Sequence, residues 1–95
     1  MSAMPTVEIT RHLHRFFPAL REGPVEVEPG SVGEVLRAVD RLAPGFTDYV
    51  LDERGALRRH VALSIDGRIV IDRATLRDQV SEASVVHVFQ ALTGG

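Results

Sequence analysis

The residues with the most specific chemical potential are the last two, Gly94-Gly95, which follow a strand-like run over residues 85–90. The α-carboxylate of Gly95 is ionised at neutral pH, because such groups titrate near about 3.5. An ionised carboxylate is a poor electrophile, so it must be activated before a nucleophile can attack it. Glycine has no Cβ atom, so a Gly-Gly tail can enter a narrow slot that other residues would block. Two glycines at a fixed place arise by chance roughly 0.5% of the time, and the ending therefore predicts a tail on which a partner acts.

No other residue in the chain offers a comparable reaction. The sequence has no cysteine, which excludes disulfides, thiolate metal sites and cysteine nucleophiles. It also has no lysine, so no side chain can receive an isopeptide bond. Gly30-Ser31-Val32-Gly33 lacks the lysine and the third glycine of a phosphate loop, and Ser31 is better explained as a helix cap than as a nucleophile. We expect no catalytic residue.

The histidines are the remaining candidates for chemistry. His12 and His14 lie two residues apart and would share one face of a strand, with Glu8 nearby. Two histidines and a carboxylate are a possible metal triad, but nothing in the sequence fixes a site, and we predict no metal. His60 and His87 lack a serine partner for nucleophilic catalysis.

The length and composition bound the class of protein. Ninety-five residues make one domain, with residues 1–5 expected as a flexible leader and residues 91–95 as an extended tail. The formal net charge is −2, so no basic excess indicates a nucleic-acid partner. No apolar run is long enough for a membrane span and no signal-peptide pattern is present. We expect a cytoplasmic monomer.

The first half of the chain predicts two strands and one helix. Residues 6–10 and 25–28 alternate apolar and polar side chains and are expected to pair as a hairpin with a long connection. Ser31 and Glu34 match a capping box, and Pro44-Gly45 ends the helix. Its apolar stripe consists of Val32, Val35, Leu36, Val39, Leu42 and Ala43.

The second half predicts a short turn or helical piece over residues 46–51 and then three strands. Residues 60–65 alternate cleanly, Asp66-Gly67 favours a type I′ hairpin turn, and residues 68–71 form the partner strand. Residues 72–83 are polar, with Leu76 and Val80 directed inward, and residues 85–90 form the last strand.

These elements predict an α+β fold. One amphipathic helix covers one face of a sheet, and the other face is solvated or used by a partner. The expected arrangement is a mixed four- to five-stranded sheet whose first and last strands are parallel and central, which is a β-grasp.

The order and spacing of these elements resemble the MoaD/ThiS family of ubiquitin-like sulfur carriers. The resemblance runs from Val7 onward and includes four features: Val25-Glu26-Val27-Glu28 before a capped helix, Ala43-Pro44-Gly45 after it, a turn at Asp66-Gly67, and the Gly94-Gly95 end. The segment 51–59, which leads into a strand, and the run 86–89 before the tail agree with it.

The resemblance implies a carrier that acts as a co-substrate and is not itself an enzyme. An E1-like adenylyltransferase of the MoeB/ThiF type would adenylate Gly95 with ATP, and a sulfurtransferase or another sulfur donor would then leave a thiocarboxylate. A downstream synthase would accept the sulfur, for molybdopterin, the thiamin thiazole, cysteine, thiolated tRNA or a secondary metabolite. No cofactor would be bound. The alternatives are a ubiquitin-like modifier joined to target lysines through Gly95 and a β-grasp adaptor with an incidental ending.

A partner surface is expected beside the tail. If the side chains of residues 86 and 88 face the core, then His87, Phe89 and Ala91 face the opposite side of the sheet, followed by Leu92. On the neighbouring strand His60, Ala62 and Ser64 would share that side. Phe89 is then either an exposed anchor for a partner or part of the core under residues 46–57. Arg58 and Arg59 would meet an acidic partner surface or form a solvated edge.

Overall fold

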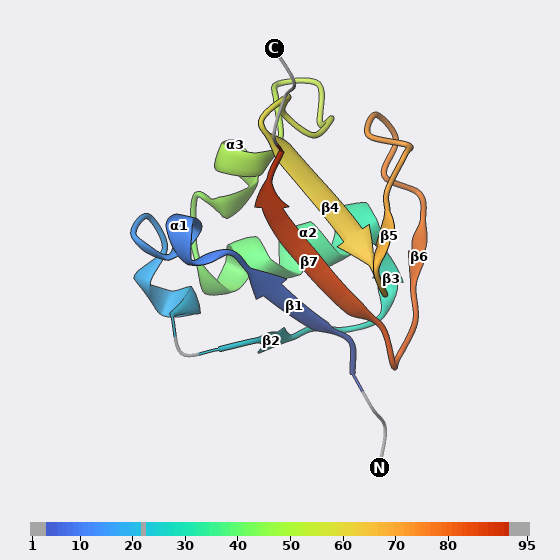
Figure 1. The fold of residues 1–95 in the computed structure, drawn as a ribbon, viewed down its shortest axis with the longest axis horizontal. Helices are drawn as coiled ribbons and strands as arrows, with labels where there is room; N and C mark the ends of the chain where they lie inside the picture. The colour runs from blue at the N-terminus through green and yellow to red at the C-terminus, as the bar shows by residue number, and fades with distance from the viewer. Residues whose placement is uncertain (1–3, 22, 92–95) are drawn as a thin grey trace.

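A helix lies across one face of a five-stranded sheet in the computed structural model, which describes residues 4–21 and 23–91 (Figure 1). The helix, α2, spans Val32–Leu42. The strands run in the order β2-β1-β7-β4-β5. Their bounds are Thr6–Ile9 for β1, Val25–Glu26 for β2, Val61–Ile65 for β4, Arg68–Ile69 for β5 and Val85–Gln90 for β7.

The last strand is the centre of the sheet. β7 pairs with β1 in parallel, in a register that places Val86 beside Val7 and His87 beside Glu8. On its other edge β7 pairs antiparallel with β4, from Val61 opposite Gln90 onward. β2 adds to the far edge of β1 in antiparallel fashion. The prediction of a mixed sheet with parallel, central first and last strands is confirmed, and the fold is a β-grasp.

The core lies between α2 and the sheet. Alternation along β7 turns Val86 and Val88 inward, and neither exposes any surface. A fully buried valine contributes about 1.5–3 kcal/mol relative to an exposed one. The helix supplies the matching layer, with four buried residues on one stripe: Val32, Val35, Leu36 and Val39.

The start of α2 is fixed by the predicted capping box, which is confirmed. The Glu34 amide donates to the Ser31 hydroxyl at 3.2 Å, and the Ser31 amide donates to the Glu34 carboxylate at 3.0 Å. That amide holds the pKa of Glu34 below its usual value. The prediction that Leu42 belongs to the buried stripe is wrong. Its side chain is 53% exposed although Ala43, the next residue, is 4% exposed, and Leu42 is the last residue of α2.

A short helix, α3 (Phe46–Val50), follows, as the helical alternative for residues 46–51 predicted. It begins after Gly45, whose φ of +98° favours glycine. The carboxylate of Asp40, on α2, accepts hydrogen bonds from the amides of Thr47 at 2.9 Å and Gly45 at 3.2 Å. These amides, that of Thr47 foremost, lower the pKa of Asp40. A residue of one helix thus caps the next.

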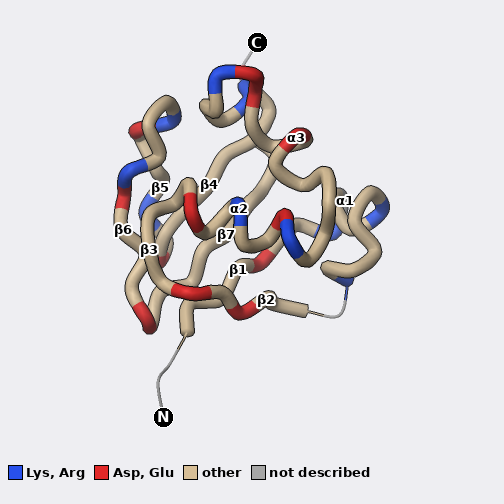
Figure 2. The backbone as a smooth tube through the Cα atoms, turned by 180° about the vertical axis from the view of Figure 1, so that it is seen from behind, with Lys and Arg blue, Asp and Glu red and all other residues tan. Residues whose placement is uncertain are grey.

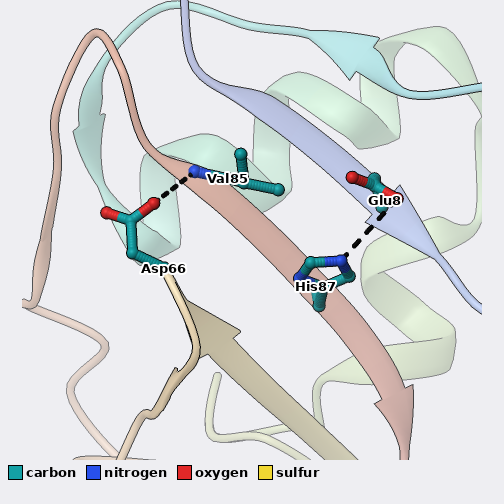
Figure 3. A network of polar contacts seen from close by, with 4 residues as sticks. All are labelled: Glu8, Asp66, Val85 and His87. Atoms are coloured by element: carbon teal, nitrogen blue, oxygen red, sulfur yellow. Dashed lines mark hydrogen bonds and ion pairs between the residues drawn. The ribbon is translucent and has the colours of Figure 1, made fainter.

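The hairpin between β4 and β5 turns at Asp66-Gly67, as predicted. Both residues have positive φ, 51° and 84°, which a type I′ turn requires. The Asp66 carboxylate also accepts the amide of Val85 at 2.8 Å, and the Asp66 amide donates to the Val85 carbonyl at 2.9 Å (Figure 3). The turn is therefore fastened to the start of β7.

A small second sheet was not predicted. It pairs β3 (Gly30–Ser31) with β6 (Gln79–Val80) in antiparallel fashion. Strands of two residues are too short to show an alternating pattern, so the sequence predicts only a polar segment around β6 and no strand. The inward orientation of Leu76 and Val80 is confirmed, since they are 3% and 2% exposed.

The connection between β1 and β2 is helical. It contains α1 (Arg11–His14) and a 3₁₀ turn, η1 (Pro18–Leu20). The prediction that His12 and His14 share a strand face is wrong. The buried residues Leu13, Phe17 and Leu20 lie four and three apart, which is helical spacing over a segment too short to recognise.

Candidate functional site

The described part of the chain carries β7 to the base of the predicted tail. The backbone amide of Ala91 donates to the carbonyl of His60 at 2.8 Å, which extends the pairing of β7 with β4 by one residue. Ala91 is half-buried. The predicted site residues Leu92, Gly94 and Gly95 lie outside the described residues, so the structure says nothing of their placement.

The face of the sheet away from α2 carries the predicted partner residues of β7. His87 is exposed and Phe89 is half-buried, whereas Val86 and Val88 are fully buried, as the alternation requires. Phe89 lies opposite Ala62 in the register and is not part of the buried core cluster. The structure thus places Phe89 on the outer face. Its contact with a partner stays a prediction.

The small residues of β4 on that face are covered. Ala62 is 7% exposed and Ser64, which lies opposite His87, is 6% exposed. β4 lies between β7 and β5, and alanine and serine side chains are short. Ala62 therefore offers a partner little surface compared with Phe89 and His87.

A contact between a histidine and a carboxylate joins β1 and β7 on this outer face. His87 Nε2 lies 3.6 Å from Glu8 Oε1, and both side chains are about half exposed, at 48% and 45% (Figure 3). The two residues are register partners. The sequence grouped Glu8 with the histidines of residues 12–14 instead, because the register of two strands so far apart in the chain could not be read from it.

A shallow hollow of about 370 Å³ lies beside this pair. Thr10 is among its lining residues, and the Oγ1 atom of Thr10 is buried and has no hydrogen-bond partner among residues 4–21 and 23–91. The hollow is lined by Glu8, Ile9, Thr10, Ser64, His87, Val88 and Phe89.

The structure differs from the prediction for His60. This residue precedes β4, so strand alternation does not orient it. Its ring contacts Tyr49 of α3 edge-on, with the ring centroids 5.6 Å apart. Tyr49 packs against the core on the helix side of the sheet. His60 therefore does not share the outer face with His87, although its carbonyl holds the base of the tail.

The predicted arginine pair lies in the same segment as His60. The Nε of Arg58 donates to the carbonyl of Asp48 at 3.2 Å, and Arg73 donates to the carbonyl of Arg58 at 2.6 Å. Arg59 is exposed. Within the described part of the chain neither Arg58 nor Arg59 forms an ion pair with a carboxylate.

An acidic turn at Asp52 precedes these arginines in the chain. The Asp52 carboxylate accepts the amides of Ala56 at 3.1 Å and Arg54 at 2.8 Å. These hydrogen bonds, that of Ala56 foremost, hold the pKa of Asp52 below its usual value. The positive charges of Arg54 and Arg58 lower this pKa further, so Asp52 also interacts with one of the two predicted arginines.

Metal clusters and membrane-spanning helices are both absent from residues 4–21 and 23–91. In these ranges no group of three or more His, Cys, Asp or Glu side chains is placed to hold a metal ion. His14 lies at the end of α1. No helix in the same ranges is long and apolar enough to cross a membrane.

Comparisons with known proteins agree with this geometry. A chain of the BexX/CysO complex from Amycolatopsis orientalis is 22% identical, with a TM-score of 0.80, over 96% of this chain and 99% of that one. CysO, an antigen of Mycobacterium tuberculosis, is 20% identical with a TM-score of 0.76, over 93% and 99%. SAMP1 from Haloferax volcanii is 18% identical with a TM-score of 0.75, over 98% and 100%.

At these low identities the structural similarity shows the fold alone, which is ubiquitin-like. A search of curated proteins found no significant match. The model of the ThiS family matches residues 14–95, which is most of the chain and includes Gly94-Gly95. The chain therefore belongs to the ThiS family and has the ubiquitin-like fold of its sulfur carriers.

Proposed function

We propose that this protein is a sulfur carrier whose C-terminal carboxylate is activated and converted to a thiocarboxylate. The observation that carries the proposal is the family match, which runs to the terminal Gly94-Gly95. The fold supports it, because the central strand of the sheet leads directly into the tail. The protein is then a co-substrate acted on in the cytoplasm, and its partners perform the catalysis.

The proposed chemistry has two steps. In the first, an oxygen of the Gly95 carboxylate attacks the α-phosphorus of ATP on an E1-like adenylyltransferase of the MoeB/ThiF type, and pyrophosphate leaves. In the second, a sulfur nucleophile at the sulfide level attacks the acyl carbon. The bond between this carbon and the phosphate oxygen breaks, and AMP leaves with that oxygen. The product is a thiocarboxylate, and neither step changes the oxidation state of carbon.

The folded domain before the tail, called the head, is expected to bind the partner enzymes. Phe89 and His87 present a phenyl ring and an imidazole on the outer face of the strand that leads to the tail, and aromatic residues are common anchors in interfaces. One structural neighbour comes from a complex of CysO with BexX, which supports partner binding by proteins of this fold. We propose that the activating enzyme and a downstream sulfur-accepting synthase bind this chain in turn.

ATP–pyrophosphate exchange tests the first step. The full chain should support exchange by an E1-like adenylyltransferase from the same genome. A variant that lacks Gly95 should not, and it is the matched control because its folded head is unchanged. Absence of exchange with every such enzyme would contradict the proposal. Covalent adducts between Gly95 and lysines of other proteins in a cell extract would instead assign the chain to the protein modifiers.

A further inference from the structure

We infer that the activating enzyme contacts a second surface of this protein, an aromatic row on the helix side of the tail. The row consists of Phe16, Tyr49 and His60, and Arg58 and Arg59 lie beside it. The expected partner surface presents an apolar side chain to the rings and a carboxylate to Arg59. This inference rests on the proposed function, and it concerns a surface distinct from the outer face of the sheet.

The three rings form a continuous series. Phe16 stacks on Tyr49 with ring centroids 5.4 Å apart and planes inclined by 28°. Tyr49 meets His60 edge-on at 5.6 Å. Phe17, which is 7% exposed, supports Tyr49 from the core side at 5.8 Å. The row is therefore anchored in the fold and needs little ordering when a partner binds.

The row is accessible where a partner would need it. Phe16 is 51% exposed, His60 is exposed and Tyr49 is half-buried. Aromatic residues are enriched in protein interfaces, and grouped exposed apolar side chains are more typical of interaction sites than single ones. The rings come from segments around residues 16, 49 and 60, so the fold has gathered them onto one surface.

The row ends at the base of the tail. The carbonyl of His60 accepts the Ala91 amide at 2.8 Å, so the last ring belongs to the residue that holds the tail in place. Phe89 precedes Ala91 by two residues on β7, and His60 is hydrogen-bonded to Ala91. An enzyme that encloses the tail from Ala91 onward would therefore lie close to both Phe89 and the aromatic row.

The positive charges of Arg58 and Arg59, beside the row, are expected to attract carboxylates of the partner. Arg59 immediately precedes His60, so their Cα atoms are about 3.8 Å apart. Arg58 is held by the Asp48 carbonyl, which uses one of its five N–H groups and leaves the others for a ligand. Figure 2 shows acidic and basic residues together on the loop between α3 and β4. The charge of Arg58 already acts on Asp52 in this loop, so Arg59 is the arginine expected to meet a carboxylate of the partner.

The test measures the KM of the activating enzyme for this protein in ATP–pyrophosphate exchange. Phe16→Ala and Arg59→Glu should each raise KM about tenfold, as the loss of an interface anchor does. The effect of Arg59→Glu should shrink as salt is added, because exposed charges are screened. Matched controls are Ile69→Ala and Arg68→Glu on β5, where Ile69 is 57% exposed and the strand lies at the sheet edge away from β7.

The outcomes separate the inference from the proposed function. Unchanged KM values for Phe16→Ala and Arg59→Glu, with normal activation of the unaltered protein, would overturn the inference alone. Equal losses in the β5 controls would also overturn it. No activation of the unaltered protein by any E1-like enzyme of the genome would overturn the proposed function and this inference with it. Light scattering that shows a dimer broken by Phe16→Ala would assign the row to a second copy of the chain and contradict the inference.

Discussion

The backbone amide of Ala91 donates a hydrogen bond of 2.8 Å to the carbonyl of His60. This bond is the last rung of the β4–β7 pairing, one residue beyond Val61 and Gln90. It fixes the position of Ala91, the base of the predicted tail, against the residue before β4. Phe89 lies two residues before Ala91, and the aromatic row ends at His60.

Removing this bond should impair activation without unfolding the head. Ala91→Pro deletes the donor, and Ala91→Ser keeps it. A net backbone hydrogen bond is worth about 1 kcal/mol, so we expect kcat/KM for adenylation to fall about fivefold in the proline variant. Pyrophosphate exchange measures the effect. Equal activity of the two variants would show that the bond does not position the tail.

Substitutions at two adjacent residues of β7 should have different effects, one on the stability of the fold and the other on binding of the activating enzyme. Val88→Ala opens a cavity in the core and should lower the free energy of unfolding by about 2 kcal/mol. Phe89→Ala, on the outer face, should change stability little and raise the KM of the activating enzyme. Urea unfolding and exchange kinetics check both. A large loss of stability in Phe89→Ala would mean that this ring packs as core.

Acid should weaken the fold through two capping carboxylates. The folded-state pKa values of Glu34 and Asp40 are lowered from ordinary values of 4.5 and 3.8, in each case mainly by a backbone amide, that of Ser31 and that of Thr47. A lowered pKa stabilises the fold above the unfolded value, and this stabilisation is lost as pH falls through the folded value.

The urea midpoint should therefore be steady near neutral pH and fall below about pH 4.5. The Glu34→Gln/Asp40→Asn variant should be less stable than the natural protein at neutral pH and should lose less stability on acidification. The two proteins should converge in strong acid. Parallel pH profiles for the two proteins would count against the assigned role of these carboxylates.

Two glycines should respond to alanine in opposite directions. Gly45 has a φ of +98°, so Gly45→Ala is strained and should cost about 1 kcal/mol or more. Gly33 lies in α2, and a Cβ atom there would meet its nearest neighbour, the Leu76 carbonyl oxygen, at an ordinary 3.8 Å. Gly33→Ala should stabilise by up to about 1 kcal/mol. Thermal unfolding compares them, and destabilisation by Gly33→Ala would contradict this.

The main elements were predictable because their signals are local. The capping box of Ser31 and Glu34 and the turn at Asp66-Gly67 each act within a few residues. The alternation of Val86 and Val88 identified the inner face of β7. Once one helix had to cover one face of the sheet, few arrangements of the strands remained.

The missed features depend on contacts distant in sequence. The Glu8–His87 pair requires the parallel register of the first and last strands. The aromatic row joins the turn after α1, helix α3 and the residue before β4. The prediction for His60 extends strand alternation one residue too far. The predictions for Leu92, Gly94 and Gly95 lie outside the described residues and still await experiment.

The most direct test of the account is the intact mass of the protein after incubation with its E1-like adenylyltransferase, ATP and a sulfide-level sulfur donor. The account predicts one sulfur in place of one oxygen at Gly95. It also predicts that Gly94→Ala, whose methyl group should block a narrow slot, is converted poorly. An unchanged mass with every such enzyme, or normal conversion of a variant that lacks Gly95, would contradict the account.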